Sequence, residues 1–63
     1  MGKESRLKEK RLALGLTQAE VAEIVGIETS AYQRYEYGRL PNAKTAVKIA
    51  RALDTTVENL YGE

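Results

Sequence analysis

The chain has 63 residues, enough for one small domain, and a domain of this size buries only about 60% of its unfolded surface. It contains no cysteine and no histidine, which excludes disulfides, thiol chemistry and the commonest metal ligands. No apolar run approaches the ~20 residues of a membrane span, and the first ten residues lack the apolar core of a signal peptide. We therefore expect a single cytoplasmic domain, residues 1–63, without a cofactor, a metal or a membrane anchor.

Charge is distributed unevenly along the chain, although the net charge is only +1. Residues 1–11 carry five basic and two acidic side chains, and residues 29–51 carry five basic and one acidic side chain. Residues 12–28 and residues 52–63 each carry three acids and no base. The two positive blocks are the kind of electrostatic pattern that binding to nucleic acid requires.

The first predicted helix begins at residue 3 or 5 and ends at Leu14, where Gly15 closes it. Leu7 and Leu14 are two turns apart, so both are expected to face the core.

Residues 17–38 predict two short helices joined by a tight turn. Thr17 and Glu20 fit a capping box, in which each side chain accepts a hydrogen bond from the backbone N–H of the other residue. The first of these helices therefore begins at about Gln18 and ends at Gly26, a residue that readily adopts positive φ. The second spans about residues 28–37, and its N-cap stays open among residues 28–30.

The second helix of this pair has two unlike sides. At about 100° per residue, Tyr32 and Tyr35 fall on an apolar side, with their hydroxyls at its rim. The opposite side carries only uncharged or cationic hydrogen-bonding groups: Ser30, Gln33, Arg34 and Tyr37. This side is either the solvated face of a small bundle or a surface that fits the DNA major groove, where paired short helices place their second member.

Asn42 is predicted to cap a further helix over residues 43–53, after the breaker-rich residues 38–41. Its apolar stripe is broad and rich in small residues: Ala43, Ala46, Val47, Ile49, Ala50 and Leu53. The other side holds three cations, which form a solvated face or contact phosphates: Lys44, Lys48 and Arg51.

A last short helix begins at Thr55 or Thr56. Its apolar residues Leu60 and Tyr61 either complete the core or contact a second subunit.

Two linked motifs carry a family resemblance: R-x3-GLTQAEVA-x3-GI-x4-YQRYEYG and P-x-A-x2-A-x2-IA-x-AL. From about Leu7 to Leu60, they resemble the helix-turn-helix domain shared by bacteriophage Cro and repressor proteins and by Xre-type bacterial regulators. The resemblance implies an all-α, compact five-helix bundle of the lambda-repressor-like type. It also implies a bacterial or phage-encoded, nucleoid-associated transcriptional regulator, in particular a repressor, whose third helix (about 28–37) enters the major groove.

The resemblance assigns roles to individual residues. Base-reading positions match Thr29, Ser30, Gln33 and Arg34. Gln can pair bidentately with adenine and Arg with guanine, each worth about 1–3 kcal/mol of discrimination, while Ser and Thr are tolerant readers. Contacts with the DNA backbone are expected from Gln18, Tyr37, Arg39 and Lys44. Gln18 is also expected to brace the reading helix.

The resemblance further implies an ion pair between Arg11 and Glu36. The pairing makes physical sense, because Glu36 lies toward the core edge of its helix, where an unpaired carboxylate is costly. We predict a partly buried salt bridge.

One reading helix spans only a few base pairs, too few to select a site. The resemblance therefore implies a homodimer on a palindromic operator in double-stranded DNA, with half-sites about 34 Å apart. No small-molecule ligand is evident.

The main rival is a protein-interaction module of the same fold, such as an antitoxin, which binds its partner through Leu60, Tyr61 and the basic face. Alanine at Gln33 and Arg34 separates the two, because only DNA binding should be lost. An enzyme is a remote third class, since the candidate hydroxyls have no base beside them and so small a core leaves no room for a useful pocket.

Overall fold

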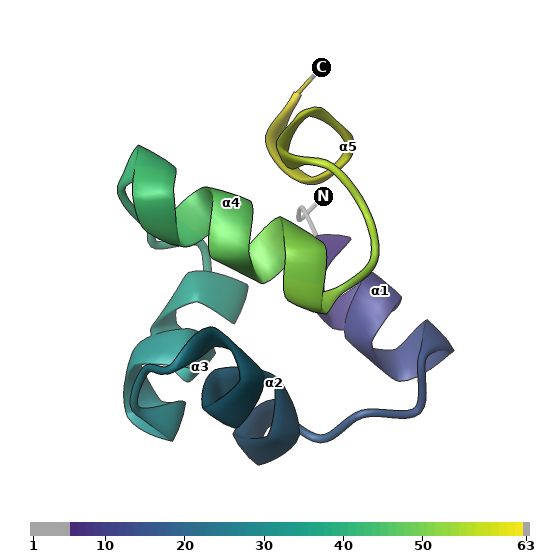
Figure 1. Cartoon of the computed structure of the whole chain (residues 1–63), viewed down its shortest axis with the longest axis vertical. Helices are drawn as coiled ribbons and strands as arrows, with labels where there is room; N and C mark the ends of the chain where they lie inside the picture. Colours follow the sequence, from purple (N-terminus) through teal and green to yellow (C-terminus); the bar gives the residue numbers. More distant parts are fainter. Residues whose placement is uncertain (1–5, 63) are drawn as a thin grey trace.

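Five helices with short connections make up the computed structural model, which describes residues 6–62 (Figure 1). The helices are α1 (Arg6–Ala13), α2 (Gln18–Val25), α3 (Thr29–Glu36), α4 (Ala43–Ala52) and α5 (Val57–Tyr61). No strand occurs within this part of the chain. The predicted all-α five-helix bundle is confirmed, whereas the predicted start of the first helix at residue 3 or 5 lies outside the described residues.

Four of the helices end in the same backbone arrangement. After α2, Gly26 adopts a left-handed φ of 88°, and the N–H of Ile27 then donates to the carbonyl of Ala22. Glycine adopts this conformation without a steric penalty, and the reversal satisfies a carbonyl that the helix end leaves unpaired. The same positive φ follows the ends of α1, α3 and α4, at Gly15, Gly38 and Asp54. The left-handed Asp54 was not predicted, because aspartate adopts positive φ much less often than glycine.

The predicted capping box starts α2. The N–H of Glu20 donates to Thr17 Oγ1 at 3.0 Å, and the N–H of Thr17 donates to Glu20 Oε1 at 2.8 Å. Such a cap contributes about 1 kcal/mol to stability. The start of α3 is different, because Glu28 occupies the N-cap without a side-chain hydrogen bond. The position of α3 therefore depends more on its packing and side-chain contacts.

The two C-terminal helices have side-chain caps as well. Asn42 Oδ1 accepts from the N–H of Thr45 at 2.8 Å, as predicted for α4. For α5, the open choice falls on Thr56, whose hydroxyl accepts from the N–H of Asn59 at 3.0 Å.

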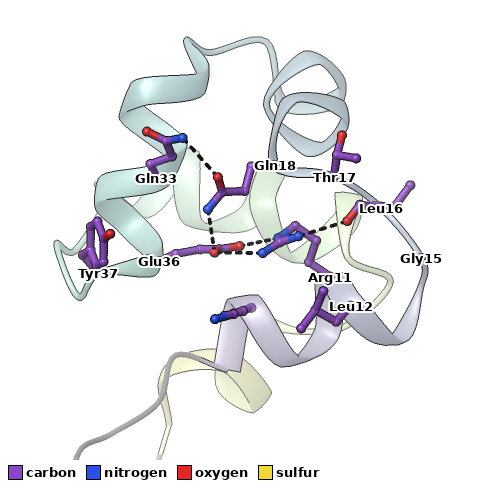
Figure 2. A pocket seen from close by; sticks show the side chains of 10 residues that line it. Arg11, Leu12, Gly15, Leu16, Thr17, Gln18, Gln33, Glu36 and Tyr37 are labelled. Atoms are coloured by element: carbon purple, nitrogen blue, oxygen red, sulfur yellow. Dashed lines mark hydrogen bonds and ion pairs between the residues drawn. The ribbon is translucent and has the colours of Figure 1, made fainter.

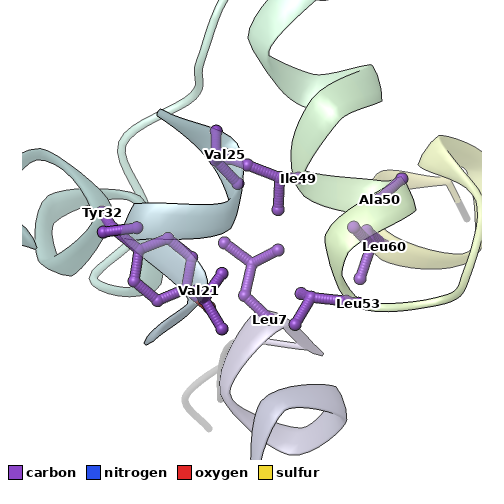
Figure 3. Close-up of a cluster of buried hydrophobic side chains, with 9 residues drawn as sticks. Leu7, Val21, Val25, Tyr32, Ile49, Ala50, Leu53 and Leu60 are labelled. Carbon is purple, nitrogen blue, oxygen red and sulfur yellow. The ribbon is translucent and has the colours of Figure 1, made fainter. Parts of the chain in front are cut away.

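The hydrophobic core lies where the five helices meet (Figure 3). Its buried members are Leu7, Val21, Ala22, Val25, Tyr32, Ile49, Ala50, Leu53 and Leu60. Tyr32 is the one fully buried side chain that α3 supplies, and α3 packs against both α1 and α2. Half-buried Tyr35 packs against the same core, and the opposite side of α3, with Ser30, Gln33 and Arg34, is left exposed.

Two predictions about α1 and α3 are wrong in detail. Leu14 is 45% exposed, because α1 ends at Ala13 and the chain reverses at Gly15. The buried position one turn after Leu7 belongs to Arg11 instead. The hydroxyl of Tyr32 is buried rather than at the rim of the core.

The buried side of α4 is narrower than predicted. Ala46, Ile49 and Ala50 are buried, but Val47 is 42% exposed and Ala43 is exposed. On the helix Ala43 and Val47 lie at one edge of the predicted stripe, beside the exposed side.

Candidate functional site

The predicted hydrogen-bonding face lies on the outward side of α3. Ser30, Gln33 and Arg34 are exposed, and Tyr37, directly after the helix, is 91% exposed. Thr29, in the first turn, is half-buried. Arg39 and Lys44 are also exposed, in the connection to α4 and in its first turn. The structure therefore exposes these side chains on one side of α3 and after it, while the contact of each residue with DNA remains a prediction.

An ion pair joins α1 to the end of α3. Arg11 Nε lies 2.6 Å from Glu36 Oε2, and Arg11 Nη2 donates to Glu36 Oε1 at 3.2 Å. The two side chains are only 10% and 6% exposed. Arg11 Nη1 donates to the carbonyl of Leu16 at 3.1 Å, so the guanidinium is also tied to the segment before α2. The predicted salt bridge is therefore present.

Two glutamines extend this ion pair to the exposed face (Figure 2). Gln18 Nε2 donates to Glu36 Oε1 at 3.0 Å, and Gln33 Nε2 donates to Gln18 Oε1 at 3.1 Å. We call Arg11, Glu36, Gln18 and Gln33 the amide network. It links α1, α2 and α3, so the bracing role expected of Gln18 is present, whereas its contact with the DNA backbone stays a prediction.

The network shifts the pKa values of its charged members. Burial raises the pKa of Glu36, but hydrogen bonds from Arg11 and Gln18 outweigh burial, so the pKa lies below its ordinary value of 4.5. The hydrogen bond to Glu36 raises the pKa of Arg11. Burial raises the pKa of the nearby Tyr32 hydroxyl. At neutral pH the carboxylate and the guanidinium are charged and the phenol is neutral.

Stability should fall in acid because of Glu36. A carboxyl group with a lowered pKa in the folded state contributes stability above its unfolded pKa and loses it as the pH falls through the folded pKa. We expect the free energy of unfolding, measured by urea denaturation between about pH 6 and pH 3, to fall mainly at pH values below 4.5, the ordinary pKa of glutamate. The Glu36→Gln variant should show a shallower fall. An NMR titration of the Glu36 carboxyl carbon centred above 4.5 would contradict this account.

An open groove lies between α1 and the end of α3 (Figure 2). It is lined by Arg11, Gln18 and Glu36 together with the exposed side chains of Leu12 and Tyr37. Within residues 6–62, no cluster of acidic, histidine or cysteine side chains is arranged to hold a metal ion. No described helix has the length and apolar character to cross a membrane.

Arg6 holds the two ends of the described chain together, a role that sequence reasoning missed. Its Nη1 donates to the carbonyls of Asn59 at 3.1 Å and Gly62 at 2.8 Å. Carbonyl partners come from any residue type, so no sequence signal marks them. Leu60 is buried, and Tyr61 is half-buried with a buried hydroxyl. Both side chains therefore complete the core, the first of the two alternatives that the sequence left open.

Comparison with known proteins gives a family match and several relatives. Residues 7–60 match the helix-turn-helix family, the same extent as the motif resemblance. The cryptic phage CTXphi transcriptional repressor RstR of Vibrio cholerae is 41% identical over 58 residues, which cover 90% of this chain and 52% of that protein. Two uncharacterized HTH-type transcriptional regulators of Archaeoglobus fulgidus are each 34% identical over 58 residues.

The relatives differ in how much of them this chain covers. The chain spans about half the length of the Vibrio protein, but 83% and 82% of the two archaeal proteins. No solved structure matches with significant similarity.

Proposed function

Since this chain belongs to the helix-turn-helix family, we propose that it is a sequence-specific regulator of transcription that binds double-stranded DNA with α3 in the major groove. The observation that carries the proposal is the outward side of α3. Within α3 (Thr29–Glu36) the one acidic residue, Glu36, is turned inward and paired with Arg11, and the exposed Glu28 lies at the N-cap before the helix. The side of α3 with Ser30, Gln33 and Arg34 carries no carboxylate and can approach the phosphates that border the groove.

The proposal assigns two roles to the side chains on and around α3. Phosphate contacts set the position of such a protein, and contacts with base edges select the sequence. In this proposal the bases are read by Thr29, Ser30, Gln33 and Arg34. The DNA backbone is contacted by Gln18, Tyr37, Arg39 and Lys44. The amide network supports the proposal, because it holds Gln18 and Gln33 in fixed positions before DNA arrives.

A single α3 reads too few base pairs, so the protein binds as a homodimer to a palindromic operator, with half-sites about 34 Å apart. Repression is the mode of regulation that the name of the Vibrio relative favours. The protein then acts in the cytoplasm, at the bacterial nucleoid or on phage DNA.

Selection from a random pool of DNA duplexes tests this function. We expect one palindromic family of duplexes to be enriched, with the half-site spacing of a two-fold dimer. Enrichment of a single unrepeated site would overturn the dimer, and enrichment of no sequence would overturn the function itself.

Binding to the selected duplex should depend steeply on salt. If a dimer neutralises about six phosphates, the logarithm of the association constant falls with the logarithm of salt concentration with a slope of about −5. Fluorescence anisotropy between about 50 and 200 mM salt then records a loss of roughly a thousandfold. A flat dependence would mean that the basic residues assigned to the backbone do not contact phosphates.

A further inference from the structure

The amide network has a direction, because a carboxylate can only accept hydrogen bonds. Glu36 is held as a carboxylate by Arg11, whose Nε and Nη2 lie 2.6 and 3.2 Å from its two oxygens. The end of Gln18 that faces Glu36 must therefore be its NH₂ group, and Gln18 Nε2 donates at 3.0 Å. The choice between the two ends of this amide is thus made by the charge of the ion pair.

The same constraint passes to Gln33. With its nitrogen turned to Glu36, Gln18 presents its oxygen to Gln33, so the facing group of Gln33 must donate. Gln33 Nε2 does so at 3.1 Å, and its carbonyl oxygen lies on the side away from Gln18 (Figure 2). Because Gln33 is exposed, this oxygen belongs to the outward face of α3. An unconstrained glutamine would present either end.

A fixed outward oxygen discriminates between bases in the major groove. Adenine and cytosine present an amino group there, at N6 and N4, whereas guanine and thymine present carbonyl oxygens, at O6 and O4. An acceptor on the protein pairs with the first two and repels the last two. Gln33 Nε2 also keeps its second hydrogen, which can donate to adenine N7, so adenine gains two bonds where cytosine gains one.

We propose that Gln18 is a specificity-determining residue that touches no base itself: by orienting Gln33, it makes the protein select an amino-bearing base, adenine ahead of cytosine, at one position of each half-site. The inference rests on the proposed function and adds to it the chemistry of one base pair. It differs from the expected role of Gln18 as a backbone contact and brace, because either of those roles changes affinity for all sequences alike.

The first test repeats the duplex selection with the Gln18→Met variant, which has similar length but no polar end. We expect the wild-type protein to prefer adenine or cytosine at one position per half-site, by about tenfold over guanine or thymine. In Gln18→Met this preference should shrink to within about twofold, while preferences at the other positions remain. An equal loss of affinity for all sequences, with the preference intact, would overturn the proposal.

The second test leaves Gln18 unchanged, so it can still overturn the proposal, through the reading role of Gln33, if Gln18→Met does not fold. The adenine at the selected position is replaced by purine, which lacks the amino group. Wild-type affinity should fall about tenfold, and the Gln33→Met variant, altered at an exposed side chain, should bind both duplexes equally. If Gln33→Met still distinguishes adenine from purine, Gln33 is not the reader. If the wild type enriches no duplex, the proposed function fails before this inference is reached.

Discussion

Replacing Arg34 with alanine is expected to weaken binding to the selected duplex by about tenfold or more per half-site and to leave the fold intact. Its guanidinium is exposed on the outward side of α3, where it can donate two hydrogen bonds to the O6 and N7 atoms of a guanine. Its preference for one base pair should disappear in a repeated selection. Electrophoretic mobility shift measures the affinity, and thermal unfolding checks the fold.

Lys48→Ala is the matched control, because it removes one exposed cation from α4 at a residue outside the set of contacts in the proposed function. Equal losses of affinity in Arg34→Ala and Lys48→Ala would show that the loss comes from the change in net charge alone. The double variant Gln33→Ala, Arg34→Ala should abolish selective binding. If the protein instead acts through a protein partner, that double variant would keep partner binding, which a pull-down with the identified partner measures.

Replacing Arg11 with methionine should lower the free energy of unfolding by about 3 kcal/mol, the largest stability effect that we expect. The variant leaves Glu36 almost buried, with Gln18 as its remaining donor. Removing one partner of a buried pair costs about 3–5 kcal/mol, and the open groove beside this pair places it at the lower end, because water can reach the carboxylate. A domain of this size has roughly 3–9 kcal/mol of stability in total, so much of that margin would be lost.

The double variant Arg11→Met, Glu36→Leu shows whether the charge or the packing is responsible. Apolar side chains of similar volume remove the unpaired carboxylate, so the double variant should be more stable than Arg11→Met alone. Urea denaturation of the four proteins of this cycle measures the coupling. Additive effects would show that Arg11 and Glu36 contribute independently.

Features set by neighbouring residues were predictable from the sequence. The Thr17 capping box, the glycine after α2 and the Asn42 cap each follow from a few adjacent side chains, and all are present. The Arg11–Glu36 pair joins two helices, and the family resemblance implied it; the cost of an unpaired carboxylate at the core edge agrees with that pairing. These features fix the two ends of α2, the start of α4 and the inward position of Glu36 on α3.

Features set by contacts between helices were not predictable in the same way. Helical periodicity predicted that Leu14 and Val47 face inward, but both are exposed. Periodicity does not show where a helix ends or how much of its surface the neighbouring helices cover. It placed Gln33 on the outward side of α3, but the direction of its amide depends on Gln18, fifteen residues earlier. The hydrogen-bonding groups that α3 exposes therefore depend on contacts with the other helices.

Arg6 has a consequence for how the domain opens. A helix of five residues such as α5 does not persist alone in water, and the ends of small domains usually fray first. The guanidinium of Arg6 and the contact between α1 and α5 couple the first described helix to the last. The slowest amide protons in both should then exchange with solvent together, in a single opening event, rather than by independent melting of either end.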